Sequence, residues 1–223
     1  MRQDKQLAIN LRKQGKSYNE ISGILNVSKS TLSNWFQKVT WSQKTKKHLS
    51  YLARKDASIR MTAMSDTRRK SLQASYRRQR SIARKQFEEF KQDRLFIAGL
   101  TIYWGEGDNK LEDGVIRVAN TDPAMIRLFY DFLKKYLPEI SDKAKIYLVL
   151  YPDLDDISCK RYWSTKVGIP LKRFINSSVI VGKSKKRTIS YGIGTITISS
   201  RLYKESIITW IDLLKKENIA DII

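Results

Sequence analysis

The sequence predicts an α+β protein, in which three short helices and a long basic helical segment precede a domain of mixed helices and strands. Three patterns support this fold class. Apolar residues recur at helical spacing through residues 6–39. No glycine or proline occurs between Ile24 and Ala98, which favours a long helix. Beyond residue 92, helical patterns alternate with short strand-like runs, which favours helices packed on one face of a mainly antiparallel sheet.

The composition indicates a polyanionic partner. The chain of 223 residues is long enough for one domain of ordinary size and a small one. It carries 43 Lys and Arg against 22 Asp and Glu, a net charge of +21. Residues 1–92 hold 22 of the basic side chains and only 6 of the acidic ones. A solvated surface rarely needs such an imbalance, and nucleic acid is the commonest partner of such a chain.

The amino-acid sequence also excludes several classes of protein. No apolar run reaches the roughly 18 residues of a spanning helix, and the N-terminus is too charged for a signal peptide. We therefore expect a cytoplasmic, nucleoid-associated protein without a membrane partner. The single Cys159 and the single His48 exclude an internal disulfide and a His-rich metal site. Any metal would be a hard cation held by oxygen, such as Mg²⁺.

The first forty residues are predicted to form three short helices separated by two turns. Gly15 stands where a glycine ends the first helix, and Ser17 with Glu20 forms a capping box for the second. Ser28 follows a short turn and is expected to cap a third helix, whose apolar side includes Leu32. Two short helices joined by so tight a turn are typical of a helix-turn-helix.

This segment resembles the helix-turn-helix of resolvases and transposases. The residues that match the pattern of that family are Ala8, Leu11, Gly15, Ser17, Ile21, Leu25, Val27, Ser28, Ser30, Thr31 and Leu32. Gly23 departs from the small alanine-like residue that is common there. The resemblance implies DNA binding, and the alternative is a trihelical bundle used for protein contacts.

In a helix-turn-helix, the start of the third helix enters the major groove. The residues expected to face base edges supply donors and acceptors, and they are Lys29, Ser30, Ser33 and Asn34. Those expected to touch phosphates are Ser28, Thr31, Gln37 and Lys38. One such unit reads only a few base pairs, so we expect a second contact surface or a homodimer.

Three regions follow from these patterns: a helix-turn-helix domain at 1–41, a basic helical linker at 42–92 and an α+β domain at 93–223. The linker holds 15 Lys and Arg against 4 Asp and Glu, and its apolar residues show no steady heptad. It is either a solvated basic connection or a helix that lies against phosphates. The two interpretations are compatible, because DNA would relieve the repulsion between its charges.

The α+β domain is predicted from its periodicity and its caps. Helices are expected over 95–104, 121–137, 156–167 and 200–216, and strands over 115–120, 145–151, 177–182 and 187–199. The free face of this sheet would be made basic by Arg117 and Lys145 beside Thr197. A turn over 183–187 adds Lys183, Lys185, Lys186 and Arg187 to the expected DNA-binding residues.

The apolar run 95–104 is followed at once by Gly105, Glu106 and Gly107. An apolar helix that ends in this way, followed by strands and helices, resembles the LAGLIDADG family of homing endonucleases, whose motif ends in D-G-E-G where this chain has W-G-E-G. The resemblance implies a saddle-shaped sheet on DNA and paired motif helices whose carboxylates hold divalent metals for phosphodiester cleavage. It assigns Glu106 as a catalytic, metal-binding residue. The packing glycine of the family falls on Thr101, and the single motif means that two carboxylates require a homodimer.

These observations leave alternative functions open. The first is a sequence-specific double-stranded DNA-binding protein, a regulator that needs no cofactor for binding. The second is a Mg²⁺-dependent LAGLIDADG-type endonuclease acting as a homodimer. Some bacterial regulators keep a LAGLIDADG-like domain without cutting, which is consistent with the first function. A third is an accessory subunit of a recombination machine. Glu106 would otherwise cap a turn or pair with a lysine. No small-molecule substrate is evident, because no phosphate-binding glycine loop or Ser/His/Asp constellation occurs.

Overall fold

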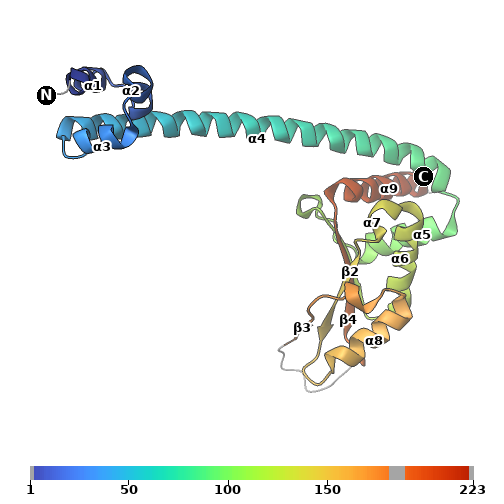
Figure 1. Cartoon of the computed structure of the whole chain (residues 1–223). Helices are drawn as coiled ribbons and strands as arrows, with labels where there is room; N and C mark the ends of the chain where they lie inside the picture. Colours follow the sequence, from blue (N-terminus) through green and yellow to red (C-terminus); the bar gives the residue numbers. More distant parts are fainter. Residues whose placement is uncertain (1–2, 181–188, 221–223) are drawn as a thin grey trace. The chain divides into compact units, whose positions relative to one another are not determined.

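The computed structural model describes residues 3–180 and 189–220. By its internal contacts the chain forms two compact units, Met1–Ser71 and Leu72–Ile223. Helices and a four-stranded sheet make up the described chain, which confirms the predicted α+β class (Figure 1). The helix α4 (Thr40–Phe90) begins in the first unit and ends in the second.

The first unit is a small helical bundle followed by the start of α4. Its elements are α1 (Gln3–Lys13), α2 (Tyr18–Leu25) and α3 (Lys29–Phe36). The predicted capping box is present, because Ser17 Oγ accepts from Glu20 N and Glu20 Oε2 accepts from Ser17 N at 2.8 Å. Asn26 ends α2 in the left-handed region, with φ at 51°. The core of the bundle consists of Ala8, Ile21, Leu32 and Phe36.

The second unit contains a mixed sheet with helices packed against it. Its helices are α5 (Arg94–Glu106), α6 (Pro123–Tyr136), α7 (Pro138–Ser141), α8 (Asp156–Val167) and α9 (Arg201–Ala220), with 3-10 turns at Leu111–Asp113 and Leu171–Arg173. Its strands are β1 (Val115–Asn120), β2 (Lys145–Leu150), β3 (Ser178–Val179) and β4 (Ile193–Ser199). The strand order is β1-β4-β2-β3, with β4 antiparallel to both neighbours and β3 parallel to β2.

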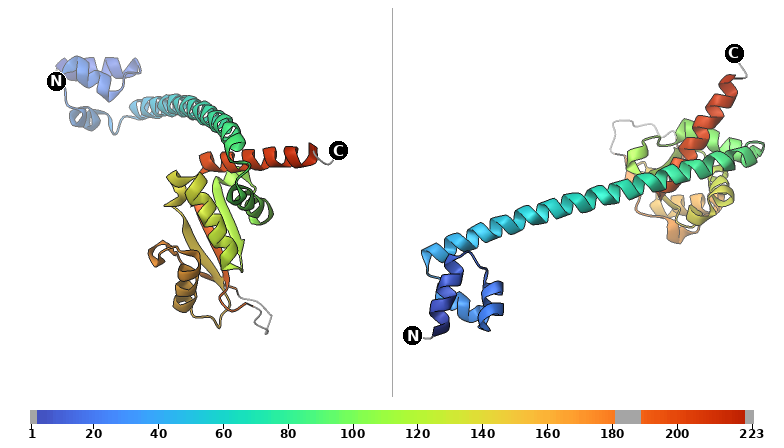
Figure 2. Two further views of the ribbon diagram at one scale, coloured as in Figure 1. Left: turned by 90° about the vertical axis from the view of Figure 1, so that its right-hand side faces the viewer. Right: turned by 90° about the horizontal axis from the view of Figure 1, so that it is seen from above.

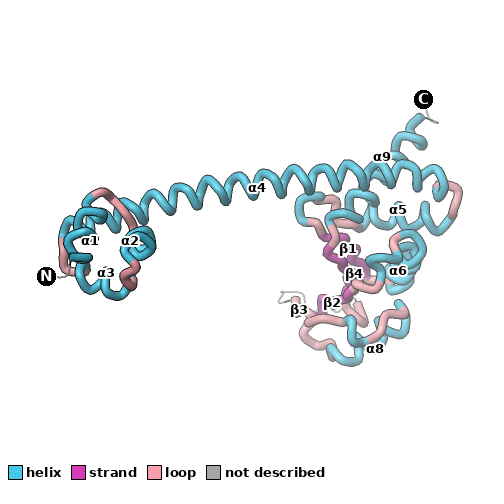
Figure 3. The backbone as a smooth tube through the Cα atoms, turned by 45° about the horizontal axis from the view of Figure 1, so that its top comes forward, coloured by secondary structure: helices cyan, strands magenta, loops and turns pink. Residues whose placement is uncertain are grey.

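An aromatic cluster joins the helices of this unit to each other. Phe96 of α5 packs against Phe132 of α6 and Trp210 of α9, with ring centroids 6.0 and 5.2 Å apart. Gly99 permits this approach, because a Cβ there would lie 2.3 Å from the ring of Phe132. α9 also runs beside the end of α4 (Figures 1 and 3), and Trp210 donates to the carbonyl of Ala83 at 2.8 Å.

Some predicted boundaries are wrong. The apolar helix does not stop at the first glycine of the GEG sequence, since α5 includes both Gly105 and Glu106 and ends against Gly107. The last strand begins at Ile193, because Gly192 has a φ of 72° that interrupts extended backbone. The strand expected over 177–182 pairs only at Ser178–Val179 within the described residues. The short helix α7 was not expected.

Candidate nucleic-acid interface

The helix α3 presents a polar face to solvent and an apolar face to the bundle. Leu32 and Phe36 are buried, whereas the residues predicted to face bases, Lys29, Ser30, Ser33 and Asn34, are all exposed. At about 100° per residue, Gln37 falls on the same face as Ser30, Ser33 and Asn34. Gln37, which was predicted to touch phosphate, therefore lies on the same exposed face as the residues predicted to face bases.

The other predicted phosphate ligands lie at the two ends of α3. Ser28 caps the helix, since its Oγ accepts from Thr31 N at 3.2 Å and lies 2.9 Å from Thr31 Oγ1. Ser28 is exposed and Thr31 is half-buried, so both hydroxyls lie at the N-terminal end where backbone N–H groups favour anions. Lys38 is exposed just beyond the C-terminal end of the helix.

Arg12 is basic but is not available to DNA. Its side chain is buried, and it donates to Lys16 O at 2.7 Å, to Ser42 Oγ at 3.1 Å and to Ser42 O at 3.1 Å. Its guanidinium also lies 4.6 Å from the centroid of the Tyr18 ring. Burial lowers the pKa of Arg12 from its ordinary value. This role of Arg12 was not predicted, although the four-residue spacing from buried Ala8 puts both residues on one face of α1.

The contacts of Arg12 belong to a junction that fixes α3 to the start of α4. Phe36 of α3 packs edge-on against Trp41 of α4, with centroids 5.9 Å apart. Gln43 Nε2 donates to Gln37 O at 2.6 Å. Because Arg12 reaches Ser42 from α1, the first turn of α4 is held by two elements of the bundle. The orientation of α3 relative to the start of α4 is therefore set within the first unit.

The sheet of the second unit carries the predicted basic residues in one row. Arg117 pairs with Thr197, and Thr197 pairs with Lys145, so the three residues lie side by side across β1, β4 and β2. They alternate with buried residues of the opposite face, which packs against α6 and α8 (Figure 2). Lys145 is exposed, whereas Arg117 is half-exposed and lies 4.0 Å from the carboxylate of Asp108. Lys183, Lys185, Lys186 and Arg187 lie outside the described residues.

Glu106 ends α5 at the surface. Its side chain is exposed, and within the described part of the chain its carboxylate forms no hydrogen bond or ion pair. Residues 107–114 follow as a loop, in which Asp108 accepts from the Tyr103 hydroxyl at 2.7 Å through its backbone carbonyl. Burial raises the pKa of that Tyr103 hydroxyl. Across residues 3–180 and 189–220, no three His, Cys, Asp or Glu side chains gather as potential metal ligands.

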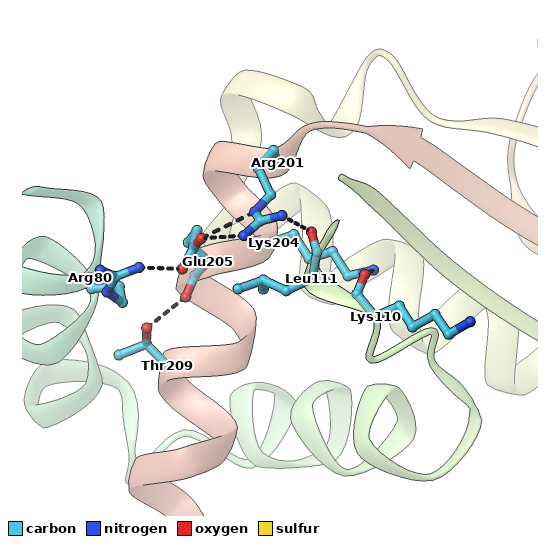
Figure 4. Close-up of polar contacts among 7 residues, drawn as sticks. All are labelled: Arg80, Lys110, Leu111, Arg201, Lys204, Glu205 and Thr209. Atoms are coloured by element: carbon cyan, nitrogen blue, oxygen red, sulfur yellow. Dashed lines mark hydrogen bonds and ion pairs between the residues drawn. The ribbon is translucent and has the colours of Figure 1, made fainter. Parts of the chain in front are cut away.

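A buried ionic network holds this loop to α9 and α4 (Figure 4). Glu205 of α9 is buried and accepts from Arg80 of α4 at 2.8 Å and from Arg201 at 3.1 Å. Arg201 also donates to the carbonyl of Leu111. No local pattern in the sequence predicts this network, because its partners come from three separate segments.

Lys204 completes the attachment of the loop. Its side chain is fully buried, and its Nζ donates to Lys110 O at 2.5 Å and lies 3.8 Å from Asp108 Oδ1. Burial lowers the pKa of Lys204, and the carboxylates of Asp108 and Asp113 oppose that shift. The position of the loop that follows Glu106 therefore depends on α9.

One comparison with known proteins supports the assignment of the N-terminal helices. A family model described as a homeodomain-like domain matches residues 2–40, the segment that holds α1, α2 and α3. No curated protein and no solved structure matched the chain. Within the residues that the structure describes, no helix has the length and apolarity needed to cross a bilayer. The N-terminal segment of this chain is thus similar to a homeodomain-like domain, which supports the predicted helix-turn-helix.

Proposed function

We propose that this protein is a sequence-specific double-stranded DNA-binding protein with a regulatory role. The observation that carries the proposal is the exposed polar face of α3 on a homeodomain-like helix-turn-helix. Asn34, Ser30, Ser33 and Gln37 supply this face with the donors and acceptors that read base edges in the major groove. The net charge of +21 supplies the attraction to phosphates that such a protein needs.

Asn34 is the residue of this face with the clearest chemistry. Its side-chain amide has one acceptor and a donor group, the pair that binds adenine N6 and N7 in a bidentate contact. Lys38, beyond the end of α3, has only donors and suits a phosphate. Asn34 should therefore carry sequence preference, whereas Lys38 should carry affinity for any sequence.

A duplex-binding experiment with these two residues tests the proposal. Asn34→Ala should cost about 1–3 kcal/mol on a preferred site and little on other duplexes, as measured by fluorescence anisotropy. Lys38→Ala should weaken binding to all duplexes alike. It should also reduce the magnitude of the negative slope of log affinity against log salt by about 0.9. Wild-type binding with no salt dependence would overturn the proposal.

A homodimer would give the protein a longer site. We infer association through α5, whose outward side exposes Thr101, Gly105 and the large Trp104 ring, 44% exposed. Small residues allow close helix approach, and a large exposed aromatic residue is typical of an interface. Sedimentation equilibrium should show a dimer that Trp104→Arg converts to monomer. A strictly monomeric wild type, free and on DNA, would contradict the dimer.

The second candidate function is a Mg²⁺-dependent DNA endonuclease of the LAGLIDADG type. The exposed position of Glu106 at the end of α5 favours it, because a metal-binding carboxylate must reach the DNA. Two copies would be needed to bring two such carboxylates together. With plasmid libraries and Mg²⁺, Glu106→Gln should abolish cleavage while it preserves duplex binding. If the wild type cleaves no DNA, only the proposed function as a DNA-binding regulator remains.

A further inference from the structure

Beyond the turns that pack on the bundle, α4 is exposed on all sides, which is unusual for a helix of a folded protein. Every residue from Ser50 to Ser65 is exposed, including Tyr51, Ile59 and Met64. Helices in proteins gain most of their stability by packing one face against a neighbour. Residues 44–70, which lie in the first unit, therefore form a helix face that is available to a partner.

The residues of this segment are sorted by chemistry around the helix. At about 100° per residue, nine residues between 44 and 70 fall within an arc of about 100°. All nine are exposed and carry an N–H or O–H donor: Lys44, Lys47, Tyr51, Arg54, Lys55, Ser58, Thr62, Ser65 and Arg69. We call this set the donor face. The two acids of the segment, Asp56 and Asp66, and all of its aliphatic residues lie outside the arc.

We propose that the donor face binds the sugar-phosphate backbone of duplex DNA, as a second contact beside α3. Interspersed ammonium, guanidinium and hydroxyl groups are the types that contact phosphate oxygens. The face extends for about 38 Å at 1.5 Å per residue, and a duplex carries about one negative charge per 1.7 Å along its axis. The inference rests on the proposed function and adds a surface to it.

Charge complementarity favours DNA over the other occupants of such a face. A second copy of α4 would bring its own cations against those of the donor face. An anionic membrane would require a continuous apolar face opposite the basic one, and that side is interrupted by Asp56, Arg60 and Lys70. Of the five cations of the donor face, only Arg69 forms an ion pair within the described residues, with Asp66 at 3.1 Å, and that pair is exposed.

The junction with the bundle fixes the beginning of the helix that carries this face relative to α3. Arg12 and Gln43 fix the first turn of α4 to the same bundle that carries α3. The first residue of the donor face, Lys44, follows Gln43 directly. The donor face therefore begins directly after the junction that holds α3.

Two full-length variants with equal charge test the proposal. The first changes Lys47, Arg54, Lys55 and Arg69 to Gln on the donor face. The control changes Lys46, Arg60, Arg68 and Lys70 to Gln on the remaining surface of the same segment. Gln, Lys and Arg have similar helix propensity, so circular dichroism should show equal helix content. The probe is a mixed-sequence 40-base-pair duplex, titrated by fluorescence anisotropy at several salt concentrations.

The donor-face variant should lower the magnitude of the negative slope of log affinity against log salt by about 3.6, which is 0.9 for each of four phosphates. The control variant should lower it by less than about 1. Equal losses in both variants, or no loss in either, would overturn the proposal. A donor-face variant that loses self-association or binding to phosphatidylserine vesicles, while it keeps the wild-type DNA slope, would assign the face to another partner and also overturn it. Failure of the wild type to bind the duplex would instead reject the proposed function.

Discussion

Arg12 and Lys13 are neighbours in α1, yet the guanidinium is buried and the ammonium is exposed. The difference follows from the helical period, which places residue 12 with Ala8 toward the bundle and residue 13 toward solvent. A basic residue in this chain is thus not always a DNA ligand. Arg12 instead satisfies the carbonyl groups of Lys16 and Ser42.

We predict that Arg12→Met destabilises the first unit by about 1–3 kcal/mol, because it leaves buried carbonyl oxygens without donors. Lys13→Met removes the same charge from the surface and should leave stability within about 0.5 kcal/mol of wild type. Hydrogen exchange of the amides of α1 and α2 in the full chain measures the stability change in both variants. Equal protection in the two variants would show that the buried contacts of Arg12 do not stabilise the bundle.

Glu20 gives the first unit a defined response to acid. Its hydrogen bonds from the Ser17 backbone and the Lys16 side chain lower its pKa to about 2. A carboxylate with a lowered pKa stabilises the fold above its unfolded pKa, near 4.3, and this contribution disappears as the pH falls toward 2. Amide protection of α2 should decrease over that interval, and Glu20→Gln should remove the pH dependence. A wild-type protection that is constant from pH 5 to pH 2 would contradict this.

At the scale of elements, the caps and the periodicity predicted most helices, because both are local. Ser17 and Ser28 both cap the helices that the sequence assigned to them. The contacts of Arg12 and Glu205 were not predictable in the same way. Ser42 is 30 residues from Arg12, and Arg80 is 125 residues from Glu205. Contacts between distant segments depend on packing that a local pattern does not record.

The packing of α5 on α6 can be tested with two of its own glycines. Gly99→Ala should cost about 1–3 kcal/mol, because the new Cβ would lie 2.3 Å from the Phe132 ring. Gly105 belongs to the same helix, and a Cβ there meets nothing within 4 Å. Gly105→Ala should therefore be neutral or stabilising by up to about 1 kcal/mol. Denaturant unfolding of the second unit measures the free-energy change of each variant. A destabilising Gly105→Ala together with a neutral Gly99→Ala would refute this packing of α5 on α6.

The attachment of α4 to α9 depends on Glu205. Arg80→Met should lower the unfolding free energy of the second unit by about 1–2 kcal/mol, since it removes one donor from a buried carboxylate while solvent screens the arginine. Arg84→Met, on the same helix but exposed, provides the control. Amide exchange in residues 76–84 is the measurement. Equal exchange in the two variants would mean that the Arg80 ion pair contributes nothing to the attachment.

At the scale of the whole molecule, the charge distribution was evident from composition alone, but its arrangement was not. The sequence shows that 22 basic residues precede residue 93. In the structure Arg12 is buried, Arg80 pairs with Glu205, and many of the remaining basic residues, including those of the donor face, are exposed. The row of Arg117, Thr197 and Lys145 could be proposed from alternation, whereas its register needed the strand pairing.

Selection of duplexes from a randomised DNA library tests the central claim most directly, because that claim is that α3 reads sequence. The full-length protein is used at a fixed salt concentration, with Asn34→Ala and Lys38→Ala in parallel. The wild type should enrich one short motif, and Lys38→Ala should enrich the same motif with weaker binding throughout. Asn34→Ala should lose preference at one base pair, which costs about 1–3 kcal/mol there. If the wild type enriches no motif, or if Asn34→Ala enriches the unchanged motif, α3 is not the recognition surface.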